Sequence, residues 1–136
     1  MLRLVKNLSF NRTVLTIPVQ VNFIFKDSKK IYGTISDETS KVIFGCSIQD
    51  VVDGFSQEEY KNHIIPFRKR RDSNDYFVVL KYESENQIAP FADPESPYGI
   101  RKDVDALVSI RVIYYKGYPT PEKSGICLKC VSDFTE

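Results

Sequence analysis

The fold is decided by the stretch Val104–Val131, which reads VDALVSIRVIYYKGYPTPEKSGICLKCV. It contains two runs rich in β-branched and aromatic residues, and a polar segment with two glycines and two prolines lies between them. This pattern predicts two β-strands joined as a hairpin. Because side chains alternate along a strand, Ile110 and Val112 are expected on one face and Arg111 and Tyr115 on the other. The hairpin is therefore predicted to have an apolar face and a mixed face of cations and aromatic rings.

Further strands and one helix are predicted upstream. A helix is expected from Ser56 to about Ile64, because Ser56 and Glu59 form a capping box and Pro66 disfavours a longer helix. Residues 50–53 form a second, shorter helical candidate. The predicted strands are Thr13–Phe25, with Pro18 at an edge or a break, then Ile31–Ser36, Lys41–Ile48 and Tyr76–Tyr82. Short polar turns separate the first three, so an antiparallel meander is expected.

These elements predict a mainly β protein, a small antiparallel barrel of five to seven strands with one short helix, similar to the OB fold. The 136 residues, 42% of them hydrophobic, are expected to form one domain over residues 1–136. No apolar run approaches the roughly 20 residues that a membrane span needs. The start lacks the apolar block of a secretory signal, and three cysteines are too few for a disulfide scaffold. We therefore expect an intracellular, cytoplasmic protein with no membrane partner.

The placement of charge is more informative than its sum. The 19 basic and 18 acidic side chains leave a net charge of only +1. Cations gather ahead of one predicted strand and, with tyrosines, around the final hairpin. Single-stranded nucleic acid is bound by cations that contact phosphates and by rings that stack on bases. We predict that the two segments form one open trough, whose contact residues are Arg68, Lys69, Arg70, Arg71, Tyr76, Arg111, Tyr115, Lys116, Tyr118 and Lys123.

No catalytic motif or phosphate-binding glycine loop is present, so neither an enzyme nor a cofactor is expected. Cys127 and Cys130 have C-x-x-C spacing, but residues three apart in a strand point to opposite faces, and zinc would need a second pair of ligands. Structural thiols and no metal site are therefore expected. A nuclease that holds a divalent metal at Asp50 and Asp53 is the enzymatic alternative, although acids near a helix N-terminus are expected for dipole reasons.

The segments Tyr98–Tyr115 and Lys123–Leu128 resemble phage-type single-stranded DNA-binding proteins of the OB fold. In those proteins an alternating strand ends in aromatics, and a loop then leads to K-x-G-I and a last strand. The resemblance implies a viral or phage protein that coats single-stranded DNA in replication or recombination, often as an oligomer. The stretch KSGICL is also similar to the end of the sheet in whirly-type transcriptional coactivators, which bind single strands on a different, dimeric fold.

The expected partners follow from the pattern of cations and rings and from the resemblance to phage-type proteins. They are single-stranded DNA, with RNA left open, further copies of the chain, and proteins of replication or recombination. The function predicted is sequence-independent binding of single-stranded DNA. A protein–protein interaction module, such as a viral structural protein or an inhibitor of a host factor, is the alternative, because balanced charge and exposed tyrosines also suit such interfaces.

Overall fold

Six strands and three short helices make up the described part of the chain. The computed structural model describes residues 14–97, 99–115 and 124–136. The elements, in chain order, are β1 (Val14–Phe25), β2 (Lys30–Thr34), α2 (Asp37–Phe44), α3 (Ile48–Phe55), β3 (Phe67–Lys69), β4 (Tyr76–Lys81), the 3-10 helix η1 (Glu85–Phe91), β5 (Val104–Tyr115) and β6 (Gly125–Cys130).

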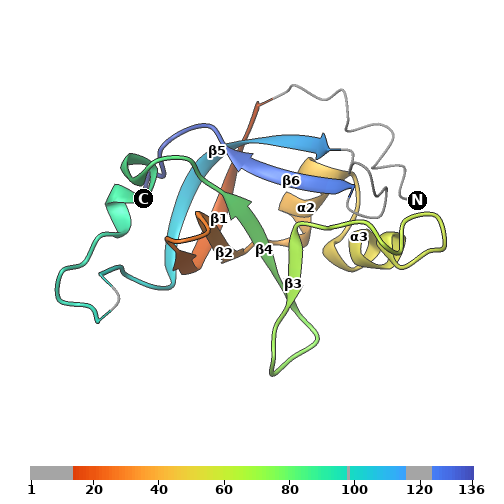
Figure 1. The fold of residues 1–136 in the computed structure, drawn as a ribbon, viewed down its shortest axis with the longest axis horizontal. Helices are drawn as coiled ribbons and strands as arrows, with labels where there is room; N and C mark the ends of the chain where they lie inside the picture. Colours follow the sequence, from red (N-terminus) through yellow and green to blue (C-terminus); the bar gives the residue numbers. More distant parts are fainter. Residues whose placement is uncertain (1–13, 98, 116–123) are drawn as a thin grey trace.

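Five of the strands close into a barrel, which confirms the predicted mainly β, OB-like architecture. Around the barrel the order is β1, β2, β4, β6 and β5, and β5 pairs with β1 again. The neighbours β5, β1, β2 and β4 are arranged as a Greek key. Four of the five junctions are antiparallel as expected, whereas β4 and β6 run parallel. Strand β3 pairs with β4 alone among the described strands, and the β3–β4 hairpin projects from the barrel (Figure 1).

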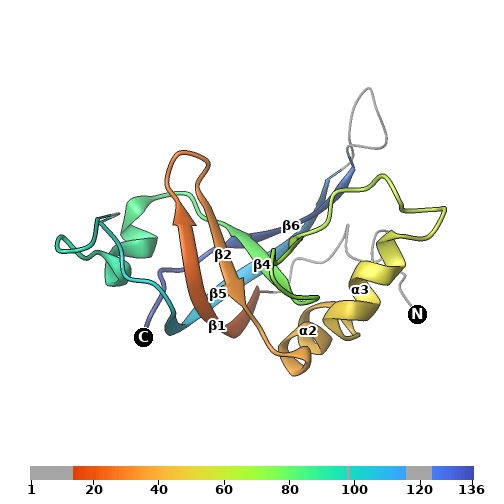
Figure 2. The same ribbon diagram turned by 90° about the horizontal axis from the view of Figure 1, so that it is seen from below.

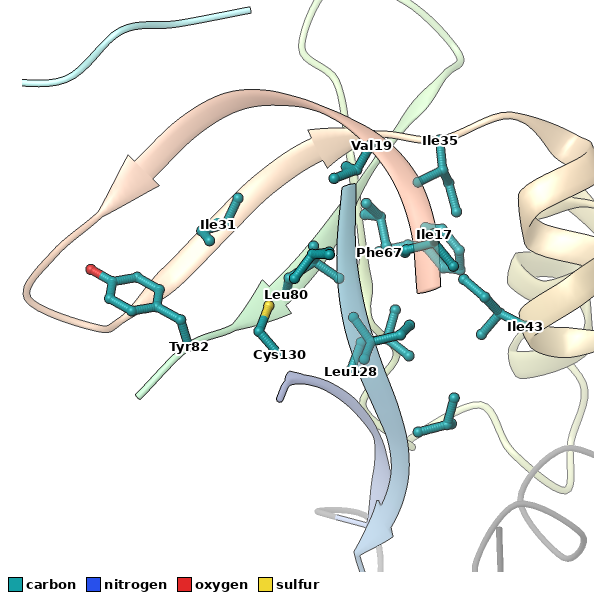
Figure 3. Packing of buried hydrophobic residues seen from close by; sticks show 14 of the residues in the cluster. Ile17, Val19, Ile31, Ile35, Ile43, Phe67, Leu80, Tyr82, Leu128 and Cys130 are labelled. Carbon is teal, nitrogen blue, oxygen red and sulfur yellow. The ribbon is translucent and has the colours of Figure 1, made fainter. Parts of the chain in front are cut away.

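The barrel interior is filled by alternate side chains of each strand. On β5 and β6 the inward residues are those predicted from the sequence, including Val108, Ile110, Ile126 and Leu128, which are all at most 2% exposed. In β1 the odd-numbered side chains Ile17, Val19 and Val21 face the interior. Figure 3 shows how side chains from different strands meet inside, among them Ile17, Val19, Ile31, Leu80, Leu128 and Cys130.

Helices lie at both ends of the barrel (Figure 2). Helices α2 and α3 add buried side chains such as Phe44 and Phe55 at one end. At the other end η1 contributes Phe91, whose ring meets that of Phe134 edge-on at 5.2 Å. None of the helices in the described ranges is long and apolar enough to cross a membrane.

The helix η1 is fastened to the barrel through one buried amide, that of Gln87. Its oxygen accepts from the backbone N–H groups of Glu83 (2.6 Å) and Ser84 (3.1 Å), and its nitrogen donates to the carbonyls of Cys130 (3.0 Å) and Ser132 (3.1 Å). All four hydrogen-bonding positions of the amide are used, so η1 is tied to the end of β6.

The helices differ from the sequence prediction in number and place. The prediction of a third strand over Lys41–Ile48 is wrong, so the three-strand meander does not form. The first half of that segment lies in α2, which the Ser36 hydroxyl caps at the Thr39 N–H (3.1 Å), and Ile48 begins α3. Ser47 caps α3 in the same way, which confirms the helical candidate at residues 50–53. The predicted helix starting at Ser56 is wrong: that residue ends α3, and turns follow it. The Ser56–Glu59 pattern therefore starts no helix, whereas Ser36 and Ser47 cap the two helices before it.

Pro18 does not break β1. It pairs with Leu107 on β5, and the pairing with β2 begins only at Gln20. At Pro18 the strand thus has one described neighbour, which fits the expectation that proline occupies an edge.

Candidate nucleic-acid interface

A hollow of about 920 Å³ lies on the outer side of β1, β2 and β4, where the β3–β4 hairpin projects. Its lining comes from three parts of the chain that are distant in the sequence: the β1–β2 hairpin, the β3–β4 hairpin, and the segment ahead of β5 that contains Ile100, Lys102 and Asp103. We call it the aromatic hollow, because four aromatic rings form its floor. These rings are Phe23, Phe25, Tyr32 and Phe77.

Each ring contacts the next, and together they form an aromatic row in the spatial order Phe25, Tyr32, Phe77 and Phe23. The ring centroids of Phe25 and Tyr32 are 4.8 Å apart, those of Tyr32 and Phe77 5.8 Å, and those of Phe77 and Phe23 5.7 Å. Phe23 and Phe25 are 37% and 46% exposed, whereas Tyr32 and Phe77 are half-buried. The row thus presents large apolar surface to solvent, which a barrel of this size would otherwise bury.

A β-bulge turns two of these rings outward. In β1, Val21 pairs with Gly33 and Phe23 with the adjacent Tyr32, so Asn22 is an extra residue. Up to Val21 the odd-numbered residues of β1 face the core. Because one inserted residue reverses the alternation, Phe23 and the later Phe25 face solvent although they are also odd-numbered.

Two cations lie over rings of the row. The Arg70 guanidinium stands 4.0 Å from the Phe77 ring centroid, and Lys102 Nζ stands 5.0 Å from that of Phe23. Arg70 also donates to the Thr34 hydroxyl on β2. Its backbone N–H donates to the Asp75 carbonyl at 2.9 Å, which closes the turn of the β3–β4 hairpin. The hairpin is therefore positioned over the row by both backbone and side chain.

The lining of the aromatic hollow is predominantly positive. Five cations line it, against the two carboxylates of Asp72 and Asp103. Cations concentrated along a concave surface raise the local potential for anionic ligands even when the net charge of the chain is small. The five cations are Arg68, Lys69, Arg70, Arg71 and Lys102.

A hydrogen-bonded network supports one end of the hollow. Asn22, the bulge residue, is 5% exposed. Its Nδ2 donates to Asp103 Oδ1 (2.8 Å) and to Gln20 Oε1 (3.2 Å), and its Oδ1 accepts from the Thr34 hydroxyl (2.7 Å). Since Thr34 in turn accepts from Arg70, the bulge, β2 and the hairpin are held together by one chain of polar contacts.

The structure places the first half of the predicted site in the aromatic hollow. Arg68, Lys69, Arg70 and Arg71 all line it, as the sequence analysis expected of a cation cluster beside rings. Tyr76 does not line it. That side chain packs against the core and borders a neighbouring polar hollow, since successive residues of β4 face opposite sides. The ring that β4 supplies to the aromatic hollow is the next one, Phe77.

The two described residues of the second half of the predicted site, Arg111 and Tyr115, do not line the aromatic hollow. Arg111 is exposed on β5 between Val14 and Lys129, outside the aromatic hollow. Tyr115, at the end of β5, is half-buried, and its pKa is raised by burial and by the Cys127 thiol, against a smaller opposing effect of Arg68. Figure 1 shows the end of β5 on the side of the molecule away from the tip of the β3–β4 hairpin. The remaining predicted contacts, Lys116, Tyr118 and Lys123, fall outside the described residues.

In the described residues the cation run lines a trough with the first hairpin, β1–β2. The expected trough with the final hairpin stays a prediction, because Lys116, Tyr118 and Lys123 lie outside the described residues. The predicted contacts did not include the four rings of the hollow or one of its cations: Phe23, Phe25, Tyr32, Phe77 and Lys102. The sequence carries no clear signal for the first two. In V-Q-V-N-F-I-F, regular alternation would place Phe23 and Phe25 on the core face with Val19 and Val21.

The described residues hold no group of three or more His, Cys, Asp and Glu side chains that could bind a metal ion. Asp53, one of the two acids considered for a nuclease, accepts a hydrogen bond from Gln49 Nε2 at 2.8 Å. Cys46, Cys127 and Cys130 are free thiols. Burial raises the pKa of Cys130 to about 12, so this thiol is neutral and packs as part of the core.

Comparisons with protein-family models, characterised proteins and solved structures found no match to this chain.

Proposed function

We propose that the aromatic hollow binds single-stranded nucleic acid, DNA in the first instance, largely without regard to sequence and without catalysis. The observation that carries the proposal is the aromatic row on the outer face of β1, β2 and β4, with Arg70 and Lys102 on its rings. In an OB barrel the face of the second and third strands is the surface that binds oligonucleotides, and β2 and β4 are those strands here.

The rings account for tolerance of sequence. Every base has an aromatic face, and stacking on a protein ring is worth roughly 1–3 kcal/mol per base whichever base it is. Stacking also requires the base to be free of its neighbours and its complement. The exposed rings of Phe23 and Phe25 are consequently suited to single strands and offer little to a duplex.

The cations account for binding of the backbone. Arg68, Lys69 and Arg71 are exposed at the rim of the hollow, where they can follow phosphates. Contacts of this kind release counterions, so they make affinity depend steeply on salt and carry no sequence information. A role in replication or recombination, together with copies of itself or other proteins, is the part of the proposal that depends on the resemblance to phage-type proteins.

The test is a titration with oligo-dT, a matched RNA and a matched duplex, followed by tyrosine fluorescence, since the chain has eight tyrosines and no tryptophan. Quenching by oligo-dT and weak binding of the duplex are expected, with affinity falling as salt rises. Affinity that is equal for duplex and single strand, or that does not change with salt, would contradict the proposal.

A protein–protein interaction module is the second candidate. The specific observation in its favour is that large apolar side chains outside the hollow, Leu107 and Val131, are also exposed. Failure to bind either form of nucleic acid at low salt would favour this class.

A further inference from the structure

One acidic side chain stands among the cations of the aromatic hollow in a fixed position. Asp103 precedes β5 with a φ of 58°, in the left-handed region that few residues other than glycine adopt. Its Oδ1 accepts from the buried Asn22 amide at 2.8 Å. Lys102, which precedes Asp103, also lies over the ring of Phe23, which follows Asn22. Asp103 is thus held beside the exposed ring at that end of the aromatic row.

A carboxylate at this place opposes the binding of phosphates. Like charges repel, and the exposed cations of the β3–β4 hairpin, Arg68, Lys69 and Arg71, are better suited to the backbone of a strand. A strand whose phosphates follow that hairpin would direct its bases over the aromatic row. A base that lies against Phe23 would then meet Asp103 with its edge.

We propose that Asp103 accepts a hydrogen bond from the amino group of a base that lies against Phe23, so that one position of the bound strand prefers cytosine to thymine. This inference rests on the proposed function. In the described part of the chain, the Asn22 amide is the one hydrogen-bond donor to this carboxylate, which leaves acceptor capacity on an exposed oxygen.

The chemistry of the two pyrimidines explains the preference. Cytosine offers an exocyclic N–H₂ donor, and carboxylates are the side chains that accept from it. Thymine has carbonyl oxygens on both sides of its single N–H, so a carboxylate beside its edge faces lone pairs. Stacking on the ring is similar for both, so the carboxylate decides between them. A single hydrogen bond of ordinary strength corresponds to about fivefold in Kd.

The test compares the full chain with its Asp103→Asn variant on oligo-dC and oligo-dT of equal length. Asparagine tolerates a positive φ and its oxygen can still accept from Asn22, so the fold is retained. The wild type is expected to bind oligo-dC about fivefold more tightly. The variant should lose or invert this ratio, because it turns an acceptor into an amide donor that suits a thymine carbonyl.

Asp72→Asn is the matched control, since it removes the other carboxylate of the hollow. It should strengthen binding of both oligonucleotides and leave their ratio unchanged. Equal affinity of the wild type for the two, or a ratio that Asp103→Asn does not alter, overturns the inference while the proposed function stands. Binding of neither oligonucleotide overturns both.

Discussion

Phe77→Leu is the substitution that tests the aromatic row most directly. Phe77 is one of the two inner rings: its centroid lies 5.8 Å from that of Tyr32 and 5.7 Å from that of Phe23, and the Arg70 guanidinium lies 4.0 Å above it. Leucine keeps an apolar side chain at a half-buried position but removes the flat face on which a base or a guanidinium can stack. The row is then divided into two separate parts.

The expected magnitude follows from these contacts. Loss of one stacking surface at roughly 1–3 kcal/mol weakens binding of oligo-dT by about 5- to 150-fold. The folded state also loses two ring–ring contacts at about 0.5–1.5 kcal/mol each and one cation–π contact at about 0.5–1 kcal/mol. Leucine recovers part of this through its own packing. A decrease of about 1–3 kcal/mol in the free energy of unfolding is therefore expected.

Because the variant is also less stable, it needs a control that loses stability elsewhere. Phe134→Leu is the same change at a side chain 1% exposed, which packs on Phe91 at the η1 end of the barrel. Kd is measured by the anisotropy of a labelled oligo-dT, and stability by urea unfolding. Phe134→Leu should lose stability and keep its Kd. If Phe77→Leu binds like the wild type, or if both variants weaken binding equally, the aromatic row is not the binding surface.

Three further predictions follow from single side chains. Arg71→Gln should flatten the slope of log K against log salt by about 0.7, whereas Arg111→Gln, outside the aromatic hollow, should leave that slope unchanged; the reverse result would move the phosphate path to β5. Burial raises the pKa of the Cys130 thiol from its ordinary value of 9.0 to about 12. Its contribution to stability is thus complete below about pH 8. Well above pH 9 the free energy of unfolding should fall by about 1.4 kcal/mol per pH unit relative to Cys130→Ala, as urea unfolding at about pH 10 and pH 11 would measure. The same change with pH in both proteins would contradict this. Gly125→Ala would place a Cβ 2.1 Å from the Ile64 carbonyl oxygen, so the segment ahead of β3 must move. The free energy of unfolding, measured by heat or urea, should fall by about 1–3 kcal/mol, and no fall would show that the segment moves without cost.

The barrel could be predicted from its last hairpin because that hairpin is regular. Along β5 and β6 the alternation of side chains has no interruption, and every residue predicted inward on the two strands, from Val108 to Cys130, is oriented as expected. Period-two patterning is a sufficient signal when register is constant. The strand count is right for a less direct reason: the wrongly predicted strand Lys41–Ile48 is offset by β3, which was not predicted.

The helices were harder to predict because short polar stretches carry competing signals. Ser36, Ser47 and Ser56 each stand at a position that could cap a helix. Which of them do so depends on where buried side chains such as Ile43 and Val51 meet the barrel end. That is a long-range contact that local sequence does not contain, so Ser56 was assigned to the wrong end of a helix.

The candidate site was half predictable for a related reason. A run of cations such as Arg68–Arg71 can be recognised from the sequence alone, because its charge does not depend on which residues lie beside it in the fold. The rings that complete the site come from three strands, β1, β2 and β4, and whether they face solvent depends on register. Tyr76 was chosen where the neighbouring Phe77 faces the hollow, an error of one residue in a strand and therefore of one face.

Asn22 connects the fold to the proposed function. As the extra residue of the bulge it reverses the alternation of β1, and this reversal is what exposes Phe23 and Phe25. Its amide also holds Asp103 and accepts from Thr34, which receives the Arg70 side chain. One buried residue thus sets the position of the rings, the acid and a cation together. The bulge lies where β1 passes from its pairing with β5 to its pairing with β2, a place where a barrel strand must bend. The same residue therefore serves the closure of the barrel and, under the proposed function, the orientation of the rings.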